Sequence, residues 1–562
     1  MKARMLWSLV VAATAVGVAL PSWAADVRDR DEAWNPPRVS PLAEGEVLPT
    51  PEELEARGAR VGEVLVAVYD IFDLDDPREN NWLFRAANAL HIRTRTRTVL
   101  DQLTFAQGQP FRAQRLEESE RILRNRRYVF DAVVRIARYD PAANVADVEV
   151  SVRDVWTLNP GISYSSSGGE SSTGFEIEEL NLLGLGQKLQ VSWDDDVDRQ
   201  STEFEWIIPN MLHSRWQLAM SYADLSDGDT TAVDLTHPFY SLDSRHAAGG
   251  TFYDDTRVQT RYDRGGPFDA LRVDSKLYEL RYGWSRGLQK GRALRWIAGL
   301  THNEQSFLPE AGETPPPGIP ETQKFVYPWI GFEWIEDAFE KSRNRDQIGR
   351  TEDHYLGTTF RGSLGYSGLD GGDEALLFSA AMTAARRYRP QLEWALSAAA
   401  NGRMESGRLV DTVLRAEARH YWHIDRGQVF FASAIGAVAE ELDPDRQILL
   451  GSEEGLRGYP LRYQAGTASA LLTLEHRVYT DWYPFRLFNV GAAAFVDSGR
   501  TWGPTPSGEP PLGWLSNVGV GLRLGNSRSG LHSMVHIDFT YTLDEVPGED
   551  RFQLTVETKQ SF

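Results

Sequence analysis

Gly455-Leu456-Arg457-Gly458-Tyr459 lies in a turn-rich segment between two groups of residues in which apolar and polar side chains alternate. An arginine that leaves water in such a segment needs an anionic partner. Two acids follow, Glu475 and Asp497, each on the side of its alternating segment that is opposite to the apolar side. If those polar sides line the inside of a barrel, a loop entering the lumen brings Arg457 to both carboxylates.

The alternation extends far on both sides of this segment. From Met534 to Leu543, apolar residues occupy every second position, and His536, Asp538, Thr540 and Thr542 occupy the places between them. The same period of two recurs over residues 278–284, 414–424 and 518–524. This period predicts β-strands with one apolar and one polar face.

Alternating strands are also found in soluble sandwiches, but three features favour a membrane barrel. The segments approach the roughly 9–11 residues of a tilted membrane strand, many have aromatic residues near their ends, and the chain ends at Phe562. Lipid offers no hydrogen-bond partner to a sheet edge, so the sheet must close on itself. We therefore expect a mainly β fold, a transmembrane antiparallel β-barrel over residues 157–562, whose first strand near Leu158–Ser166 pairs with the last near Phe552–Phe562.

The first 24 residues have the features of a signal peptide. Lys2 and Arg4 precede an apolar run, and Ser22-Trp23-Ala24 places small residues where a signal peptidase cleaves. The run is short for a membrane anchor of about 20 residues. The sequence therefore predicts export, with cleavage after Ala24.

Charge and cysteine content exclude several classes of function. The formal net charge is −21, and loss of Lys2 and Arg4 makes it −23, which argues against nucleic acid as a partner. The chain has no cysteine, so disulfides, thiol nucleophiles and cysteine-based metal sites are excluded. Stability must then come from a hydrogen-bonded sheet or a large core.

Two regions precede the expected barrel. Residues 25–60 are rich in proline and in charged residues, a composition typical of a linker. Residues 61–156 predict one small α+β module with strands near 61–69, 128–136 and 146–152 and helices over 81–90 and 111–126. An edge strand of such a sheet can pair with an extended client segment; alternatively, the module supports or plugs the barrel.

The order of these parts, with several motifs, resembles the BamA/TamA-type superfamily of outer-membrane proteins, bacterial surface-antigen barrels with POTRA-like periplasmic modules. The resemblance covers nearly the whole mature chain. It rests on the Gly455–Tyr459 motif, on the terminal Phe562 and on three further stretches: Asp154-Val155-Trp156-Thr157-Leu158-Asn159-Pro160, Asn181-Leu182-Leu183-Gly184-Leu185-Gly186 and Phe495-Val496-Asp497-Ser498-Gly499.

The resemblance implies a lumen loop around residues 440–466 whose Arg457 reaches Glu475 and Asp497, with Phe495 and Gly499 as a strand motif and Phe562 as a terminal signal. Removing Arg457 from such a network would cost ~3–5 kcal/mol if the acids are buried, but only ~0–1 kcal/mol for a surface pair. The resemblance also implies sixteen strands. Direct counting gives about fifteen candidate strands before the loop and five after it, so a larger barrel remains an alternative.

The implied function is outer-membrane protein assembly, insertion or translocation, with the module in the periplasm. The seam between first and last strands would open and pair with a client. Partners would be outer-membrane lipid or lipopolysaccharide, client outer-membrane or secreted polypeptides, and accessory periplasmic proteins. A two-partner-type secretion pore and a passive channel are alternatives.

A barrel enzyme, such as a lipase, is the functional hypothesis with the least support. No Gly-x-Ser-x-Gly or His-Glu-x-x-His pattern is present, and we predict no catalytic residue, cofactor or metal. Asp194-Asp195-Asp196 with Asp198 fits either a divalent-cation site or, more commonly, a solvated acidic turn.

Overall fold

The computed structural model describes residues 34–42, 46–167, 170–309, 322–343, 345, 350–368, 372–425, 427–526, 528–530, 534–546 and 550–559. The signal peptide 1–24, part of the 25–60 region and Phe562 lie outside the described residues. No helix in the described part combines the length and the apolar character needed to cross a bilayer.

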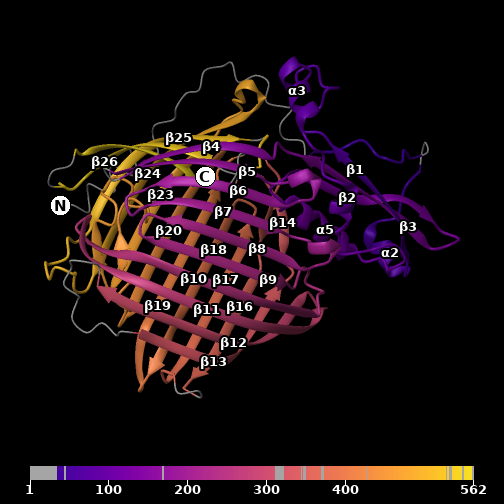
Figure 1. The fold of residues 1–562 in the computed structure, drawn as a ribbon. Coiled ribbons are helices and arrows are strands. Elements are labelled where there is room, and N and C mark those ends of the chain that lie inside the picture. Colours follow the sequence, from indigo (N-terminus) through magenta and orange to yellow (C-terminus); the bar gives the residue numbers. More distant parts are fainter. Residues whose placement is uncertain are drawn as a thin grey trace.

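Most of the chain forms a closed, antiparallel barrel of twenty strands (Figure 1), which confirms the mainly β barrel fold. In chain order the strands are β4 Leu158–Ser167, β5 Glu170–Glu179, β6 Lys188–Asp195, β7 Gln200–Ile208, β8 Gln217–Leu225, β9 Gly228–His237, β10 His246–Asp263, β11 Gly266–Gln289, β12 Arg292–Pro309, β13 Thr322–Glu336, β16 Thr358–Ser367, β17 Ala375–Arg389, β18 Leu392–Glu405, β19 Arg408–His423, β20 Gln428–Glu440, β23 Ala468–Tyr479, β24 Phe488–Trp502, β25 Leu515–Asn526, β26 Met534–Thr542 and β27 Phe552–Lys559.

The sixteen strands implied by the resemblance are corrected to twenty; the larger barrel that was left open is the one observed. Fifteen strands precede the loop after β20 and five follow it, as direct counting along the sequence gave. The physical reason is that all twenty pair with two neighbours around the ring, so none of the extra strands is a folded-back loop. Two short hairpins, β14–β15 (Phe339–Ser342 and Glu352–Tyr355) and β21–β22 (Ile448–Leu450 and Gln464–Gly466), stay outside the ring.

Strand alternation sorts side chains to the two faces of the barrel wall. In β11, Tyr278, Leu280 and Tyr282 are exposed on the outer face. Between them, Glu279 and Arg281 form an ion pair at 3.1 Å. The outer surface of the barrel is therefore largely apolar, while charged and amide groups gather inside it.

The N-terminal module (residues 46–156) contains a three-stranded sheet in the order β1-β3-β2, from β1 Arg60–Tyr69, β2 Val129–Asp140 and β3 Val145–Asp154. β1 runs parallel to β3, and β2 runs antiparallel to it. The helices are α3 Trp82–Leu90, α4 Thr96–Leu100 and α5 Ala113–Arg124. The α5 residues Leu116 and Leu123 bury their side chains in the core with apolar residues of β3, namely Val148, Val150 and Val152.

Part of the predicted linker belongs to this module, which corrects the 25–60 boundary. Helix α2 (Pro51–Ala56) begins with a capping box between Thr50 and Glu53. Its Leu54 is fully buried in the module core. Further upstream, the Val39 backbone N–H donates to buried Glu149 at 3.0 Å. Prolines indicated an extended linker, but a capped helix and the apolar side chains of Leu48, Leu54 and Ala59 fold this stretch onto the module core.

The module lies across one end of the barrel (Figure 1), here called the module end. It contacts strand connections on opposite parts of the rim: Thr98 with Gly184, Asp101 with His213, Glu118 with Leu242, Arg124 with Asp353, and Glu79 with both Arg486 and Arg528. The opposite end of the barrel is here called the loop end.

Strand β2, one of the two edge strands of the module sheet, is not free to pair with a client segment. Its outward carbonyl at Val129 accepts from Arg350 at 2.8 Å, and its outward N–H at Val134 donates to Glu120 at 3.1 Å. Arg350 belongs to the barrel connection between β13 and β16, and Glu120 belongs to α5. The module therefore has its β2 edge closed by its own helix and by the barrel. The other edge strand, β1, is bonded at its start by the backbone of residues 108–111, for example from the Val61 N–H to the Gln109 carbonyl at 2.9 Å. Beyond Val61, no named strand lies beside β1 in the described residues.

Candidate functional site

The lumen loop (residues 441–467) joins β20 to β23 and folds back into the barrel. Its hairpin β21–β22 brings the Gly455–Tyr459 motif against the inner wall. Leu456 and Tyr459 are fully buried, and they pack with Leu471 of β23 and Leu515 of β25. Apolar burial at a lumen-facing patch therefore holds the loop inside.

The structure brings Arg457 to both of the acids that the sequence proposed for it. Its Nε and Nη2 donate to the two carboxylate oxygens of Asp497 at 2.8 and 2.9 Å. Its Nη1 donates to Glu475 at 3.0 Å. The guanidinium also lies 3.3 Å from the ring centroid of Phe495, so the strand motif supplies both the acid and an aromatic face for the cation.

Neighbouring groups complete the hydrogen bonding of the two acids. Asp497 also accepts from Thr473 Oγ1 and from Asn517 Nδ2, each at 2.9 Å. Glu475 also accepts from Arg477 at 2.9 Å. Because Asp497 has no solvent-exposed surface, loss of Arg457 would leave a buried charge without its main counter-ion.

Two glycines of the motif are required by local geometry. Gly455 has φ +108°, which L side chains rarely adopt. A Cβ on Gly458 would lie 3.0 Å from side-chain carbons of Asn517 and Thr542. Between them, Tyr459 donates its hydroxyl to the Ser516 carbonyl at 2.7 Å. In the adjacent wall, a Cβ on Gly499 would lie 2.8 Å from Leu450 of the loop.

A third acid near Arg457 was not identified from the sequence. Asp538 of β26 lies 3.7 Å from the Arg457 Nη1, and it pairs with fully buried Arg523 of β25 at 2.5 Å. Asp538 was visible as a polar residue on an alternating strand. Nothing in its spacing indicated that barrel curvature would bring it beside the loop.

Further ion pairs fix the root and the tip of the lumen loop, and sequence reasoning missed these as well. Asp443 accepts two hydrogen bonds from Arg403 of β18, both at 2.7 Å. Arg462 binds both carboxylate oxygens of Asp198, in the β6–β7 turn, at 2.7 and 2.8 Å. The loop thus crosses the barrel and is held by walls on either side of it.

This pairing changes the interpretation of the acidic run at 194–198. Asp198 is engaged by Arg462, and Asp196 accepts the backbone N–H groups of Asp198 and Arg199 at 2.8 Å. Both observations fit an acidic turn. In the described part of the chain, no three His, Cys, Asp or Glu side chains are grouped as metal ligands.

The seam between β27 and β4 is weakly registered. Among the described residues, which stop at Lys559 in β27, its register consists of one pair, Val556 with Ser166. On their other sides, β4 pairs with β5 over ten residues and β27 with β26 over eight. The barrel is closed, but over the described residues the seam has fewer register pairs than either of its flanks.

At the module end, the β13–β16 connection (residues 337–357) links the module to the inner wall. Asp353 pairs with Arg124 of α5 at 2.5 Å. On the lumen side, Arg345 pairs with Glu393 at 2.9 Å, and its carbonyl accepts from the Tyr479 hydroxyl at 2.8 Å. Burial, with the nearby cations Arg345 and Arg387, lowers the pKa of His354 to about 3, so this imidazole is neutral where it meets Arg345.

The Asn181–Gly186 stretch forms the turn between β5 and β6, and it has a docking role that the sequence did not reveal. Gly184 has φ +74°, and its carbonyl accepts from Arg95 N–H at 3.0 Å and from Thr98 Oγ1 at 2.8 Å. A Cβ on Gly184 would lie 2.5 Å from the Arg93 carbonyl oxygen. This turn therefore lies directly on the module.

Comparison with known proteins gives structural likenesses only. No family model matches the chain, and no curated protein matches it. Among solved structures, BamA from Haemophilus ducreyi lacking POTRA domains 1–3 is 12% identical, with a TM-score of 0.39, covering 88% of this chain and 84% of that one. CdiB from Acinetobacter baumannii is 12% identical, with a TM-score of 0.46, covering 89% and 73%.

CdiB from Escherichia coli is 13% identical, with a TM-score of 0.45, covering 89% of this chain and 76% of that one. BamA belongs to the family that the sequence motifs resemble. With identities of 12–13% and TM-scores below 0.5, these likenesses carry no information about what this chain does.

Proposed function

We propose that this protein is an outer-membrane assembly, insertion or translocation factor that works by opening the seam between β27 and β4 and pairing the freed edges with a client polypeptide. The apolar outer surface of the barrel supports a bilayer location. The N-terminal module would then lie in the periplasm. No bond chemistry is required, and we propose no catalytic residue, cofactor or metal.

The observation that carries this proposal is the short register of the seam. Breaking ladder hydrogen bonds in lipid leaves unsatisfied N–H and C=O groups, each costing several kcal/mol. A seam with one described pair, Val556 with Ser166, has few such groups to expose. Among the described residues, opening this seam therefore separates fewer paired positions than opening any other pair of neighbouring barrel strands, which favours it as the place where a client strand is accepted.

The two blocked ends of the barrel favour this lateral route over transport through the lumen. The lumen loop enters from the loop end and is bound to the inner wall by Arg457, Arg403 and Arg462, and the module lies across the other end. A secretion pore or a passive channel would first have to release one of these closures. Client capture by the module would use the part of the β1 edge that follows Val61, because the β2 edge and the start of β1 are occupied.

The test is a reversible lock on the seam. The natural chain has no cysteine, so Val556→Cys with Ser166→Cys introduces one thiol pair, and directly opposite residues on antiparallel strands are close enough for a disulfide. The protein is placed in liposomes and given an urea-unfolded eight-stranded outer-membrane barrel. Folding of that barrel is followed by its heat-dependent mobility on gels.

We expect the oxidised variant to fold the added barrel no faster than empty liposomes, and we expect a reductant to restore the rate. Met220→Cys with Val233→Cys locks β8 to β9, which are paired over their lengths, and should leave the rate unchanged. Undiminished folding with a locked seam would overturn lateral opening. Polypeptide export that continues through a locked seam would indicate a secretion pore instead.

A further inference from the structure

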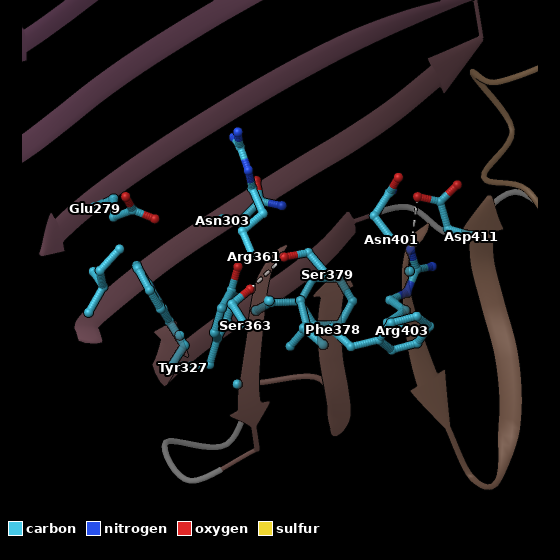
Figure 2. A pocket seen from close by; sticks show the side chains of 18 of the residues that line it. Glu279, Asn303, Tyr327, Arg361, Ser363, Phe378, Ser379, Asn401, Arg403 and Asp411 are labelled. Carbon is cyan, nitrogen blue, oxygen red and sulfur yellow. Dashed lines mark hydrogen bonds and ion pairs between the residues drawn. The ribbon is translucent and has the colours of Figure 1, made fainter. Parts of the chain in front are cut away.

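A cavity of about 560 Å³ opens from the inner wall of the barrel, away from the Arg457 network (Figure 2). Strands β11–β13 and β16–β18 supply most of its lining, and Asp443 at the root of the lumen loop borders it. Its volume lies within the roughly 300–1,000 Å³ of small-molecule sites. Neither the seam nor the module edge uses this cavity.

One wall of the cavity is a row of aromatic side chains. Phe325, Tyr327 and Trp329 occupy successive inward positions of β13. Glycines on the two flanking strands make room for two of these rings: a Cβ on Gly299 would lie 2.5 Å from the Trp329 indole, and one on Gly365 would lie 2.5 Å from the Tyr327 ring. The rings therefore lie over the neighbouring strands, which leaves their other faces toward the cavity.

The orientation of the central indole is fixed. Trp329 Nε1 donates to Thr301 Oγ1 at 3.0 Å, and the Thr301 hydroxyl donates to Glu279 at 3.1 Å. Because the indole N–H is already satisfied by the wall, the ring offers the lumen an apolar face rather than a donor.

Polar groups without partners lie on both sides of the aromatic row. Arg361 of β16, Asn303 of β12 and Asn401 of β18 all line the cavity, and among the described residues none of their side chains has a hydrogen-bond or ion-pair partner. Figure 2 shows the Arg361 side chain extended away from its strand. This cation contrasts with Arg457, Arg403 and Arg523, each of which is bound to an acid.

We propose that this cavity is a binding site for an acidic saccharide. A sugar ring has a C–H face that packs on an aromatic ring, and hydroxyls around its edge that pair with amides such as those of Asn303 and Asn401. A carboxylate or sulfate on the sugar would meet Arg361, whose planar guanidinium can donate two parallel hydrogen bonds to it.

Other ligand classes fit the cavity less well. An acyl chain would desolvate Arg361 and both asparagines without giving them partners, which is costly. A polypeptide would find no free strand edge here, because each lining strand is paired on both sides. A saccharide uses the aromatic faces, the amides and the cation together.

The experiment measures binding of three compounds to the full-length protein in detergent by calorimetry and ligand-observed NMR. Digalacturonate carries sugar rings and carboxylates, maltose carries rings without charge, and acetate carries the charge alone. We expect digalacturonate to bind more tightly than maltose, and acetate not to bind measurably.

Two variants distinguish the contribution of the Arg361 charge from that of stacking on Trp329. Arg361→Gln should weaken digalacturonate binding about tenfold, the effect of one charged hydrogen-bonded contact of about 1.4 kcal/mol, and leave maltose binding unchanged. Trp329→Leu should weaken binding of both sugars. Trp296→Leu is the matched control, because Trp296 is exposed on the outer face of β12, and it should alter neither.

Several results would overturn the proposal. Failure of digalacturonate to bind the folded wild-type protein would do so, as would acetate binding as tightly as digalacturonate, which would indicate an anion site only. Equal affinity of wild type and Arg361→Gln for digalacturonate would show that the Arg361 guanidinium does not bind the carboxylate. Heat-dependent gel mobility checks the fold of each variant; if Trp329→Leu does not fold, the Arg361→Gln comparison still decides.

Discussion

At the scale of single residues, the lumen loop depends on one guanidinium between two acids. Arg457 uses three nitrogens on Asp497 and Glu475 and places its plane on Phe495. Every group in this cluster is at most 8% exposed. A buried ion pair adds little to the free energy of unfolding compared with apolar side chains of the same size. Removing only one partner lowers that free energy strongly, because the other charges stay buried without a counter-ion.

We expect Arg457→Ala to destabilise the folded barrel by about 3–5 kcal/mol, the cost of breaking a buried pair from one side. The measurement is the urea midpoint of unfolding in detergent, followed by heat-dependent gel mobility. Arg457→Lys should recover only part of the loss, since an ammonium cannot reproduce the two parallel bonds to Asp497.

Arg361→Ala is the matched control, since it also removes a lumen-facing arginine but one without a described partner. Its effect should stay within about 0.5 kcal/mol, as for substitutions away from such networks. Equal midpoints for Arg457→Ala and wild type would show that the network contributes nothing to the stability of the loop.

The sequence identified Glu475 and Asp497 as partners because a period of two fixes which side of a strand each residue faces. It did not identify Asp538 or the Arg462–Asp198 pair. Those contacts depend on how far the wall curves and where the loop lands, and Arg462 and Asp198 are 264 residues apart. Alternation predicts which face a residue occupies, but not its neighbours across the lumen.

At the scale of elements, the connections at the module end serve as docking points. The Asn181–Gly186 turn bonds Arg95 and Thr98 around α4, and the β13–β16 connection bonds α5 and the β2 edge. The first connection is a tight turn of leucines and glycines, and the second, residues 337–357, contains the β14–β15 hairpin. Their shared role in docking therefore comes from the module residues that they contact.

We expect Gly184→Ala to loosen the module from the barrel. The added Cβ would lie 2.5 Å from the Arg93 carbonyl oxygen, a backbone atom that cannot move without shifting α4. Hydrogen exchange should rise in α4 and in the turn itself, because the bonds to the Gly184 carbonyl would lengthen or break.

Gly291→Ala provides a close control. Gly291 has the same φ of +74°, in the β11–β12 turn, but nothing lies within 4 Å of its added Cβ. Both variants carry the left-handed penalty of roughly 1–2 kcal/mol, and only Gly184→Ala carries the clash. Equal exchange in α4 for the two variants would contradict a docking role for the turn.

Element types were readable from sequence where apolar periodicity was long, as in the twenty strands and α5. The α2 helix was missed because its six residues carry one buried side chain, Leu54, amid prolines and acids that indicate a linker. The strand number was correct when counted from alternation and wrong when taken from the resemblance, since only the alternation belongs to this chain.

At the scale of the whole molecule, the barrel is obstructed at both ends, and its described residues have the shortest strand register along the β27–β4 side. The module covers one end (Figure 1), and the lumen loop crosses near the other between Arg403 on one wall and Asp198 on another. The seam has one described register pair. Movement of a client along the barrel axis requires the lumen loop or the module to be displaced, whereas lateral passage requires only that the seam between β27 and β4 opens.

We expect the wild-type protein to be almost non-conducting in a planar lipid bilayer, and the Arg403→Ala with Arg462→Ala double variant to conduct. These substitutions remove the bidentate hold on Asp443 and the hold on Asp198 without touching Arg457. Losing about 1.4 kcal/mol of the free energy that holds the loop closed would raise the open fraction about tenfold, and loss of one partner from a buried pair such as Arg403–Asp443 exceeds that amount.

Arg408→Ala is the control, because its partner Glu441 also belongs to the lumen loop but the Arg408 side chain is 70% exposed, and such exposed pairs contribute little to stability. Conductance that is equally high in wild type and both variants would mean that the loop does not close the lumen, and it would favour a channel over lateral passage.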